Sequence, residues 1–203
     1  MLRENLIAGV DEVGRGTLAG PVVAGAVILD TKNHESWMDR IRDSKKLSAK
    51  ARQEVALLIQ QHASAANCGL ATSKEIDDLG IVEATRLAMK RAVENLKIQP
   101  SLLLVDGLPI GNLGVQAQFL IHGDASDISI AAASIVAKVF RDSLMADLDI
   151  LHPGYNFARH KGYGTKEHMM RLHTLGPCSE HRRTFRPVSN MFNSQNLSAH
   201  TKS

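Results

Sequence analysis

Two adjacent acids near the start of the sequence could bind a metal ion. Residues 9–16 are Gly-Val-Asp-Glu-Val-Gly-Arg-Gly and follow a short apolar run. The carboxylates of Asp11 and Glu12 repel each other, and a hard divalent cation such as Mg²⁺ or Mn²⁺ would relieve that repulsion. The glycines that follow allow backbone groups to approach a ligand closely. This combination indicates phosphate chemistry, although a simple acidic turn after an edge strand would give the same short pattern.

Two later acids also follow apolar segments. Asp106 comes directly after residues 102–105, and Asp124 follows the expected strand at residues 115–121. Ligand sites in open α/β sheets gather at the carboxyl ends of strands, so we expect these acids to converge with Asp11 and Glu12. Four converging carboxylates need cations, and two metal ions about 3.5–4 Å apart can activate water and stabilise a leaving oxygen. Each acid taken singly is equally consistent with a turn.

The segments that would position these acids alternate between strands and helices. We expect strands at residues 6–10, 21–29, 68–71, 102–105 and 115–121. We expect helices that begin at the caps Ser48 and Thr165 and at Ser73, and helices over residues 81–96 and 128–151. This alternation predicts an α/β fold with a largely buried sheet. The three alanines at 131–133 favour tight packing of their helix on that sheet.

Length and composition are those of a soluble globular protein. The chain has 203 residues, of which 44% are hydrophobic and 22% charged, so it can bury a substantial core. It lacks the roughly 20 consecutive apolar residues of a membrane span, and its polar start does not resemble a signal peptide. Cys68 and Cys178 imply no disulfide framework, so we expect a cytoplasmic protein. We expect one domain over residues 1–189 and a disordered tail over residues 190–203.

Positive charge is concentrated in one segment. Residues 152–186 carry seven Lys or Arg residues, two acids and five histidines. A local basic excess is typical of proteins that bind a polyanion, although a solvated basic face would be equally consistent. The histidines, with Cys178 and His181 at a ligand-like spacing, leave a zinc hydrolase as an alternative. Zinc needs three or four convergent ligands, and no matching Cys pair is present.

Five blocks of the sequence, in order, resemble the ribonuclease HII family. They are residues 11–21, 43–48, 105–107, 123–142 and 160–185. Together they span about residues 6–188, and five blocks in family order are a highly specific signal. The resemblance implies an α/β, ribonuclease H-like fold: a mixed central sheet flanked by helices, with a helical C-terminal region. It implies a metal-dependent endonuclease that hydrolyses the RNA strand of RNA/DNA hybrids and nicks DNA 5′ of embedded ribonucleotides.

The resemblance also assigns roles to individual residues. It implies that two Mg²⁺ or Mn²⁺ ions bind to Asp11, Glu12, Asp106 and Asp124, with Asp142 a weaker contender for the fourth acid. It implies that the 2′-hydroxyl of ribose is recognised by the backbone of Gly14, Arg15 and Gly16 and by Tyr163. The predicted phosphate contacts are Lys45, Lys46, Ser134, Lys138 and Arg182. The alternative for Tyr163 is a half-buried core tyrosine. The alternative for the phosphate contacts is an ordinary capped or solvated surface.

Other classes fit the sequence less well. A nucleotide-binding NTPase is disfavoured, because residues 14–16 lack the Gly-Lys-Ser/Thr ending of a phosphate loop. A non-catalytic hybrid-binding module is disfavoured, because acids facing phosphate weaken binding. We therefore expect a monomer that acts on RNA/DNA hybrids and ribonucleotide-containing DNA, without a membrane. Residues 193–197 faintly resemble the tail segment with which some relatives engage a sliding clamp, a possible replication or repair partner.

Overall fold

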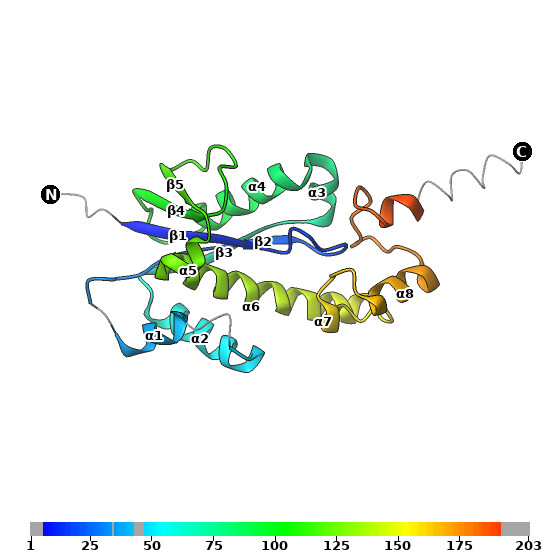
Figure 1. Ribbon diagram of the computed structural model, residues 1–203, viewed down its shortest axis with the longest axis horizontal. Helices are drawn as coiled ribbons and strands as arrows, with labels where there is room; N and C mark the ends of the chain where they lie inside the picture. Colours follow the sequence, from blue (N-terminus) through cyan, green and yellow to red (C-terminus); the bar gives the residue numbers. More distant parts are fainter. Residues whose placement is uncertain (1–5, 34, 43–46, 192–203) are drawn as a thin grey trace, which may run out of the picture.

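The protein is built around a central mixed sheet (Figure 1). The computed structural model describes residues 6–33, 35–42 and 47–191, and within these ranges the sheet has five strands. They are β1 (Ile7–Val13), β2 (Val22–Ile28), β3 (Ala65–Ala71), β4 (Leu102–Asp106) and β5 (Ala117–Leu120). Their order is β3-β2-β1-β4-β5, with β1 antiparallel to β2 and parallel to β4. The predicted mixed α/β sheet is therefore confirmed.

Helices cover both faces of this sheet. The helices of the described residues are η1 (Ser36–Met38), α1 (Asp39–Arg42), α2 (Ala49–His62), α3 (Ser73–Leu79), α4 (Ile81–Glu94), α5 (Gly123–Ser126), α6 (Ile128–Leu151), α7 (Phe157–His160) and α8 (Lys166–Leu175). Figure 1 shows α3 and α4 on one face and α1, α2 and α6 on the other. Each face buries its own apolar core, with Val10 and Leu103 on the α4 side and Val27 on the α6 side. The helices α7 and α8 lie beyond the end of the sheet.

Local sequence signals place most of these elements. The predicted helix over residues 128–151 has the bounds of α6, and the Asp127 side chain caps it by accepting hydrogen bonds from the Ser129 and Ile130 amides. Ser48 and Thr165 cap α2 and α8 as predicted. The first strand is longer than predicted, because residues 11–13 still pair with β2. The two acids thus lie inside β1, beyond the predicted end of the strand at residue 10.

Helix α6 lies unusually close to the sheet. A Cβ atom on Gly9 would be 2.1 Å from the Ser129 carbonyl carbon, and one on Gly25 would be 2.3 Å from the Ala133 carbonyl oxygen. Only glycine therefore permits this approach on β1 and β2. The predicted tight packing of alanines 131–133 is confirmed, since all three are buried. The position of α6 is consequently fixed against the two strands beneath it.

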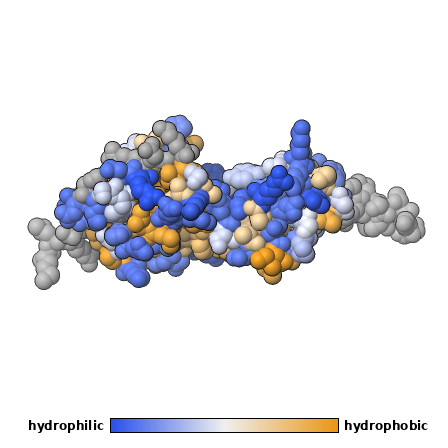
Figure 2. Space-filling view, turned by 90° about the horizontal axis from the view of Figure 1, so that it is seen from below, coloured by the Kyte–Doolittle hydropathy of each residue, from blue (hydrophilic) through white to orange (hydrophobic). Residues whose placement is uncertain are grey.

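The C-terminal part of the described chain is also folded. Residues 188–191 are helical, and Met191 packs against Leu172 and Val188, so the first two residues of the predicted tail belong to the folded part. Residues 192–203, with the predicted clamp-binding segment at 193–197, lie outside the described residues. No described helix combines the length and the apolar character that crossing a membrane requires. Figure 2 shows that the surface on the α1, α2 and α6 side is largely hydrophilic, with a few apolar patches.

Candidate active site

Neighbouring strands bring three of the predicted acids to one edge of the sheet. β1 carries Asp11 and Glu12, and β4 ends at Asp106. These strands pair in parallel, with Val10 opposite Val105, so Asp11 and Asp106 follow directly on adjacent strands. The carboxylates influence one another electrostatically, since the charge of Asp106 acts on both acids of β1. This edge is where the parallel strands of an α/β sheet place a ligand site.

Asp11 is the most constrained of these acids. Its side chain is only 6% exposed. Burial raises its pKa to about 7, with further contributions from the charges of Glu12 and Asp106, while a hydrogen bond from the Ser134 side chain opposes the shift. Gly25 is its cross-strand partner, and the absence of a side chain there lets α6 bring Ser134 against the carboxylate. Asp11 is thus an oriented acid whose negative charge is costly in the protein alone.

Glu12 shows a milder version of the same conflict. Burial raises its pKa and the charge of Asp106 adds to the effect, while hydrogen bonding and charge from Arg15 oppose it. The Arg15 Nη1 and Glu12 Oε1 atoms are 3.1 Å apart, and the arginine side chain is 45% exposed. Because the arginine side of this ion pair is solvated, the pair is weak and easily rearranged. The Glu12 carboxylate can therefore turn to another cation without disturbing the fold.

Asp124 reaches the same region by a different route. After β5, His122 adopts a left-handed conformation and the Gly123 amide donates to Asp106 Oδ1 at 2.6 Å. Asp124 is the next residue, and it lines a small pocket of about 150 Å³ with Asp127. Within the described ranges, no group of three or more acidic, histidine or cysteine side chains already has the geometry of a metal site. The structure thus brings the four acids to one region without closing them around a common point.

The Gly14–Gly16 turn follows the acids directly. Gly14 has a φ of +93°, and a Cβ atom there would lie 2.2 Å from Arg141 Nε. A Cβ atom on Gly16 would meet nothing within 4 Å, so this side of the turn is open. Among the described residues, the amide groups of Arg15 and Gly16 donate to no protein acceptor. The turn therefore offers unpaired backbone donors beside the acids.

Arg182 holds this turn from behind and is not a phosphate contact. Its side chain is fully buried, with no exposed surface. The guanidinium donates to the carbonyl oxygens of Gly14 at 2.7 Å, Arg15 at 2.8 Å and Gly20 at 2.9 Å. A phosphate contact would need access to solvent that this side chain lacks. The sequence prediction for Arg182 was therefore wrong, because a long-range fold contact buries the residue.

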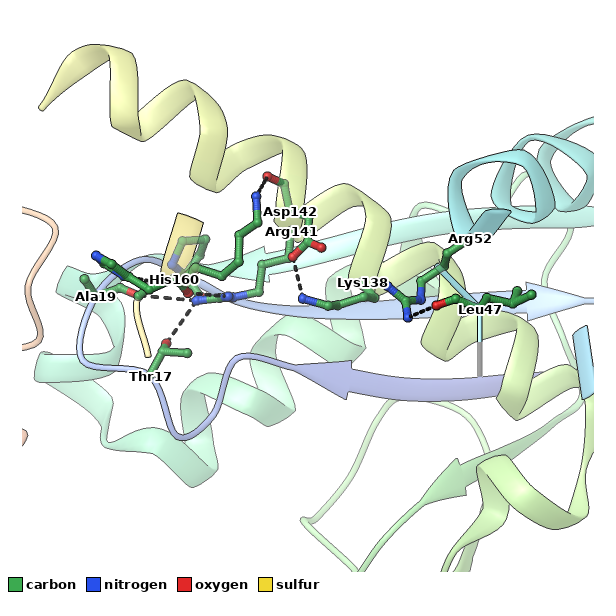
Figure 3. Close-up of polar contacts among 11 residues, drawn as sticks. Thr17, Ala19, Leu47, Arg52, Lys138, Arg141, Asp142 and His160 are labelled. Atoms are coloured by element: carbon green, nitrogen blue, oxygen red, sulfur yellow. Dashed lines mark hydrogen bonds and ion pairs between the residues drawn. The ribbon is translucent and has the colours of Figure 1, made fainter. Parts of the chain in front are cut away.

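The other predicted phosphate contacts have varied surroundings. Ser134 hydrogen-bonds to Asp11, as described above. Lys138 is partly exposed and its Nζ atom lies 2.5 Å from Asp142 Oδ1. Asp142, the weaker contender for the metal site, is thus paired with a lysine of its own helix (Figure 3). Lys45 and Lys46 lie outside the described residues.

Tyr163 lies on a loop, residues 161–165, that touches the segment after the turn. The residue is 43% exposed, and among the described residues it belongs to none of the buried apolar clusters. The Leu18 amide donates to the Gly162 carbonyl at 2.8 Å, which ties the loop to the chain that follows the Gly14–Gly16 turn. A Cβ atom on Gly162 would lie 2.3 Å from the Ala19 carbonyl oxygen. The Tyr163 loop therefore packs against the chain that follows the Gly14–Gly16 turn.

Comparison with known proteins decides the family. The model of the family described as Ribonuclease HII matches residues 8–188. The chain belongs to the ribonuclease HII family. Ribonuclease HII from Lactobacillus johnsonii is 52% identical over 92% of the chain and 73% of its own length. Ribonuclease HII from Nitrosococcus oceani is 50% identical over 90% of the chain and 89% of its own length.

Solved structures agree with this assignment. Ribonuclease H2 from Pyrococcus horikoshii has a TM-score of 0.78 and 25% identity over 94% of the chain and 98% of its own. Bst-RNase HIII in complex with Mn²⁺ has a TM-score of 0.68 and 16% identity over 95% of the chain and 70% of its own, and shares the fold. The ribonuclease H-like fold predicted from the sequence is confirmed. As a ribonuclease HII family member, the chain is an endoribonuclease, a hydrolase acting on RNA/DNA hybrids.

A buried histidine cluster sits beneath the Tyr163 loop. His160 and His168 stack at 4.2 Å between ring centroids, and the Nε2 atoms of His168 and His181 are 3.1 Å apart. His181 Nδ1 accepts from the Cys178 amide, so its Nε2–H donates to His168, whose Nδ1–H then donates to the Tyr163 carbonyl. Burial lowers the pKa of His168 and also that of His181, the latter to about 4. The neighbouring His168 adds to the shift of His181.

This arrangement answers the zinc alternative. Both ring nitrogens of His160, His168 and His181 are already used in hydrogen bonds. The cluster is structural within the described residues, and these three histidines are buried. Sequence reasoning did not show that Arg141 and Thr17 lie behind the turn. The available signal was an arginine at position 141, seven residues after Ser134 on one helix face.

Proposed function

We propose that this chain is a divalent-metal-dependent nuclease that also nicks duplex DNA on the 5′ side of a single embedded ribonucleotide. The metal ions would be held by Asp11, Glu12, Asp106 and Asp124. The observation that carries this proposal is Asp11, a buried carboxylate whose pKa is raised to about 7 beside two other acids. Perturbed acids of this kind concentrate at functional sites.

The donor set fits Mg²⁺ or Mn²⁺. Both ions prefer carboxylate oxygens, and a bound cation would remove the penalty of gathering negative charges here. When bound, two such ions would activate water and stabilise the leaving oxygen of the phosphodiester. The chain itself orients the acids: Ser134 holds Asp11, and the Gly123 amide holds Asp106. Lys138 lies on the same helix face as Ser134 and would position a phosphate by exchanging its partly exposed ion pair with Asp142.

Ribose recognition follows from the neighbouring surface. We call the Gly14–Gly16 turn and Tyr163 the ribose-sensing surface. The free amide groups of Arg15 and Gly16 can donate to a 2′-oxygen, and the exposed Tyr163 ring can press on the sugar. Because the turn follows the acids in the chain, the ribose and the scissile phosphate would bind at adjacent sites. A deoxyribose offers no oxygen to these donors.

A single assay tests the proposal. The substrate is a DNA duplex with one ribonucleotide, incubated with Mg²⁺, Mn²⁺ or a chelator, and the matched control has deoxyribose at that position. We expect one cut, 5′ of the ribonucleotide, that requires metal and is absent from the control duplex. Comparison of the two metals establishes which supports faster cutting. Cleavage in the chelator, or equal cleavage of the all-DNA control, would contradict the proposal.

The oligomeric state and a protein partner are the last parts of the proposed function. One structure with the same fold is that of a PCNA:RNase HII complex from Archaeoglobus fulgidus, with a TM-score of 0.74 and 22% identity over 89% of the chain and 95% of its own. For the present chain, we propose a monomer that can bind a sliding clamp through its C-terminal residues. Light scattering tests the first statement. Clamp binding by the full chain and by a variant lacking residues 192–203 tests the second.

A further inference from the structure

Arg141 lies where the two parts of the ribose-sensing surface meet. It belongs to α6, and its side chain has no exposed surface. A charged side chain of this size is rarely buried unless its donors are satisfied. Direct contact with a nucleic acid is excluded by this burial. The side chain must therefore act on other parts of the protein.

The guanidinium satisfies its donors on two separate segments (Figure 3). On the segment after the turn, Nε donates to the Pro21 carbonyl at 2.9 Å, and Nη2 donates to Thr17 Oγ1 at 3.0 Å and to the Ala19 carbonyl at 3.3 Å. On the Tyr163 loop, Nη1 donates to the Lys161 carbonyl at 2.9 Å. One planar group thus joins the two segments, which are more than a hundred residues apart in sequence.

The link extends to the turn itself. Thr17 Oγ1 donates in turn to the Gly14 carbonyl at 3.0 Å. The guanidinium also packs directly beneath Gly14, where a Cβ atom would collide with it. These contacts direct the carbonyl of Gly14 inward, and the Arg182 contacts do the same for Arg15. The open side of the turn is then left to its amide groups.

The same helix also orients the acid. Ser134, which hydrogen-bonds to Asp11, lies seven residues before Arg141 on one face of α6. Seven residues of helix span about 10 Å, and the close packing on Gly9 and Gly25 prevents α6 from sliding over the sheet. A displacement of about 1 Å at a reacting centre can cost about 100-fold in rate. The separation between ribose sensing and bond cleavage is therefore set by one rigid element.

We propose that Arg141 is a positioning residue that fixes the Gly14–Gly16 turn and the Tyr163 loop relative to Asp11, and so couples ribose recognition to cleavage. This inference rests on the proposed function of the ribose-sensing surface. Arginine suits the role because its planar fork can donate to four acceptors at once. A lysine ammonium is a point charge with three donors and cannot span the same set.

The first test uses Arg141→Lys and Arg141→Met with the single-ribonucleotide duplex. We expect kcat to fall about 100-fold while KM stays within about threefold, because phosphate contacts elsewhere still bind the duplex. The matched control is Met89→Ala, a buried residue of α4 on the opposite face of the sheet, which lowers stability without touching the surface. All variants are assayed well below their melting temperatures. A loss no larger than in the control, or a rise in KM with unchanged kcat, would overturn the proposal.

A second pair of variants keeps the test decisive if the Arg141 variants fail to fold. Thr17→Val removes the hydroxyl between Arg141 and Gly14, whereas Thr17→Ser retains it. We expect kcat to fall about tenfold for valine, as loss of a buried hydrogen bond predicts, and to be restored to within about twofold for serine. Equal activity of both variants would contradict the coupling.

Failure of this inference is distinguishable from failure of the proposed function. If wild-type protein cuts the all-DNA control as well, the proposed ribose sensing fails regardless of Arg141. If wild-type protein requires the ribose and the Arg141 and Thr17 variants behave like Met89→Ala, only the positioning role fails.

Discussion

Asp11 and Arg182 are both buried, and each has a like charge beside it, but their surroundings differ. Asp11 lies next to Glu12 and Asp106, and its pKa is raised to about 7. Arg182 lies near Arg141, and burial with this neighbouring charge lowers its pKa to about 9. The guanidinium nevertheless donates to three backbone carbonyls. The carboxylate is bonded by Ser134 and the Glu12 amide and remains in conflict with its neighbours.

The difference separates two kinds of buried charge. Carbonyl oxygens around each arginine disperse its positive charge and fix the local backbone, so the group needs nothing from outside the protein. The hydrogen bonds and ion pair of Asp11 and Glu12 do not offset their burial and mutual repulsion, so a cation from solution would improve their energy. The first arrangement is suited to holding a surface rigid and the second to binding a ligand. The predictions below test this contrast, from the largest expected effect to the smallest.

Removal of an acid should have the largest effect. Asp11→Asn or Asp106→Asn should reduce cleavage at least about a thousandfold, because several kcal/mol of transition-state stabilisation would be lost. Single-turnover cleavage and duplex binding are the measurements. Binding of the duplex should persist. The control is Asp78→Asn, which removes an exposed acid of α3 paired with Lys74 and should leave the rate unchanged. Near-normal activity of either site variant would contradict the assignment.

Loss of one hydroxyl on the ribose-sensing surface should have a smaller effect. Tyr163→Phe should reduce kcat on a single embedded ribonucleotide about tenfold, because a hydrogen bond to the sugar is lost while the ring still packs. The melting temperature should change little, since the substitution removes only the hydroxyl of a residue that is 43% exposed. Unchanged cleavage would remove Tyr163 from the surface.

Metal binding should stabilise the wild-type protein and not the acid variant. At a metal concentration about 100 times the dissociation constant, the gain is about 2.7 kcal/mol, or a rise of about 5–10 °C in melting temperature for a chain of this length. Asp11→Asn should shift by less than about 2 °C. Without metal, the stability of the wild-type protein relative to Asp11→Asn should fall as pH rises toward 7, because a raised pKa favours the protonated, folded form at lower pH. Equal metal-induced shifts in both proteins would place the ions elsewhere.

Acid should weaken the histidine cluster. The pKa of His181 is lowered to about 4 in the folded protein, so the unfolded chain binds its proton first. The cluster's contribution is therefore complete above about pH 6.5 and is lost as pH falls toward 4. In the Asp11→Asn variant, where the opposing titration of Asp11 is absent, we expect a drop of about 5 °C in melting temperature between pH 6.5 and 5. His181→Asn, which can still accept from the Cys178 amide, should flatten this dependence, and an unchanged slope would assign it to other groups.

Local sequence signals predicted much of the fold. Helix periodicity and the cap at Asp127 define α6, and the continuous apolar run before Asp106 defines β4. The surroundings of Arg182 were not predictable, because its partners Gly14 and Gly20 lie more than 160 residues away. Burial of the histidines likewise depends on long-range packing. A basic residue in a basic segment gives no local sign of whether solvent or backbone carbonyls will surround it.

For the site residues too, the sequence predicted the position in the fold but not the surroundings of the side chain. The sequence placed Asp11 and Asp106 correctly at one edge of the sheet, because strand order follows general rules for α/β folds. It did not predict the hydrogen bond from Ser134 to Asp11, because Ser134 was predicted to contact phosphate. That bond depends on how closely α6 approaches β2 at Gly25. A helix–sheet distance is not encoded in any single segment.

The contact between α6 and the two glycines has a consequence for chimaeric enzymes. Gly9 and Gly25 meet the helix backbone itself, so no choice of side chain on α6 can make room for a larger residue at either position. A helix transplanted from a relative with a different strand surface would sit further out and carry its serine and arginine with it. The strands β1 and β2 and the helix α6 therefore form one indivisible module, to be exchanged between homologues together or not at all.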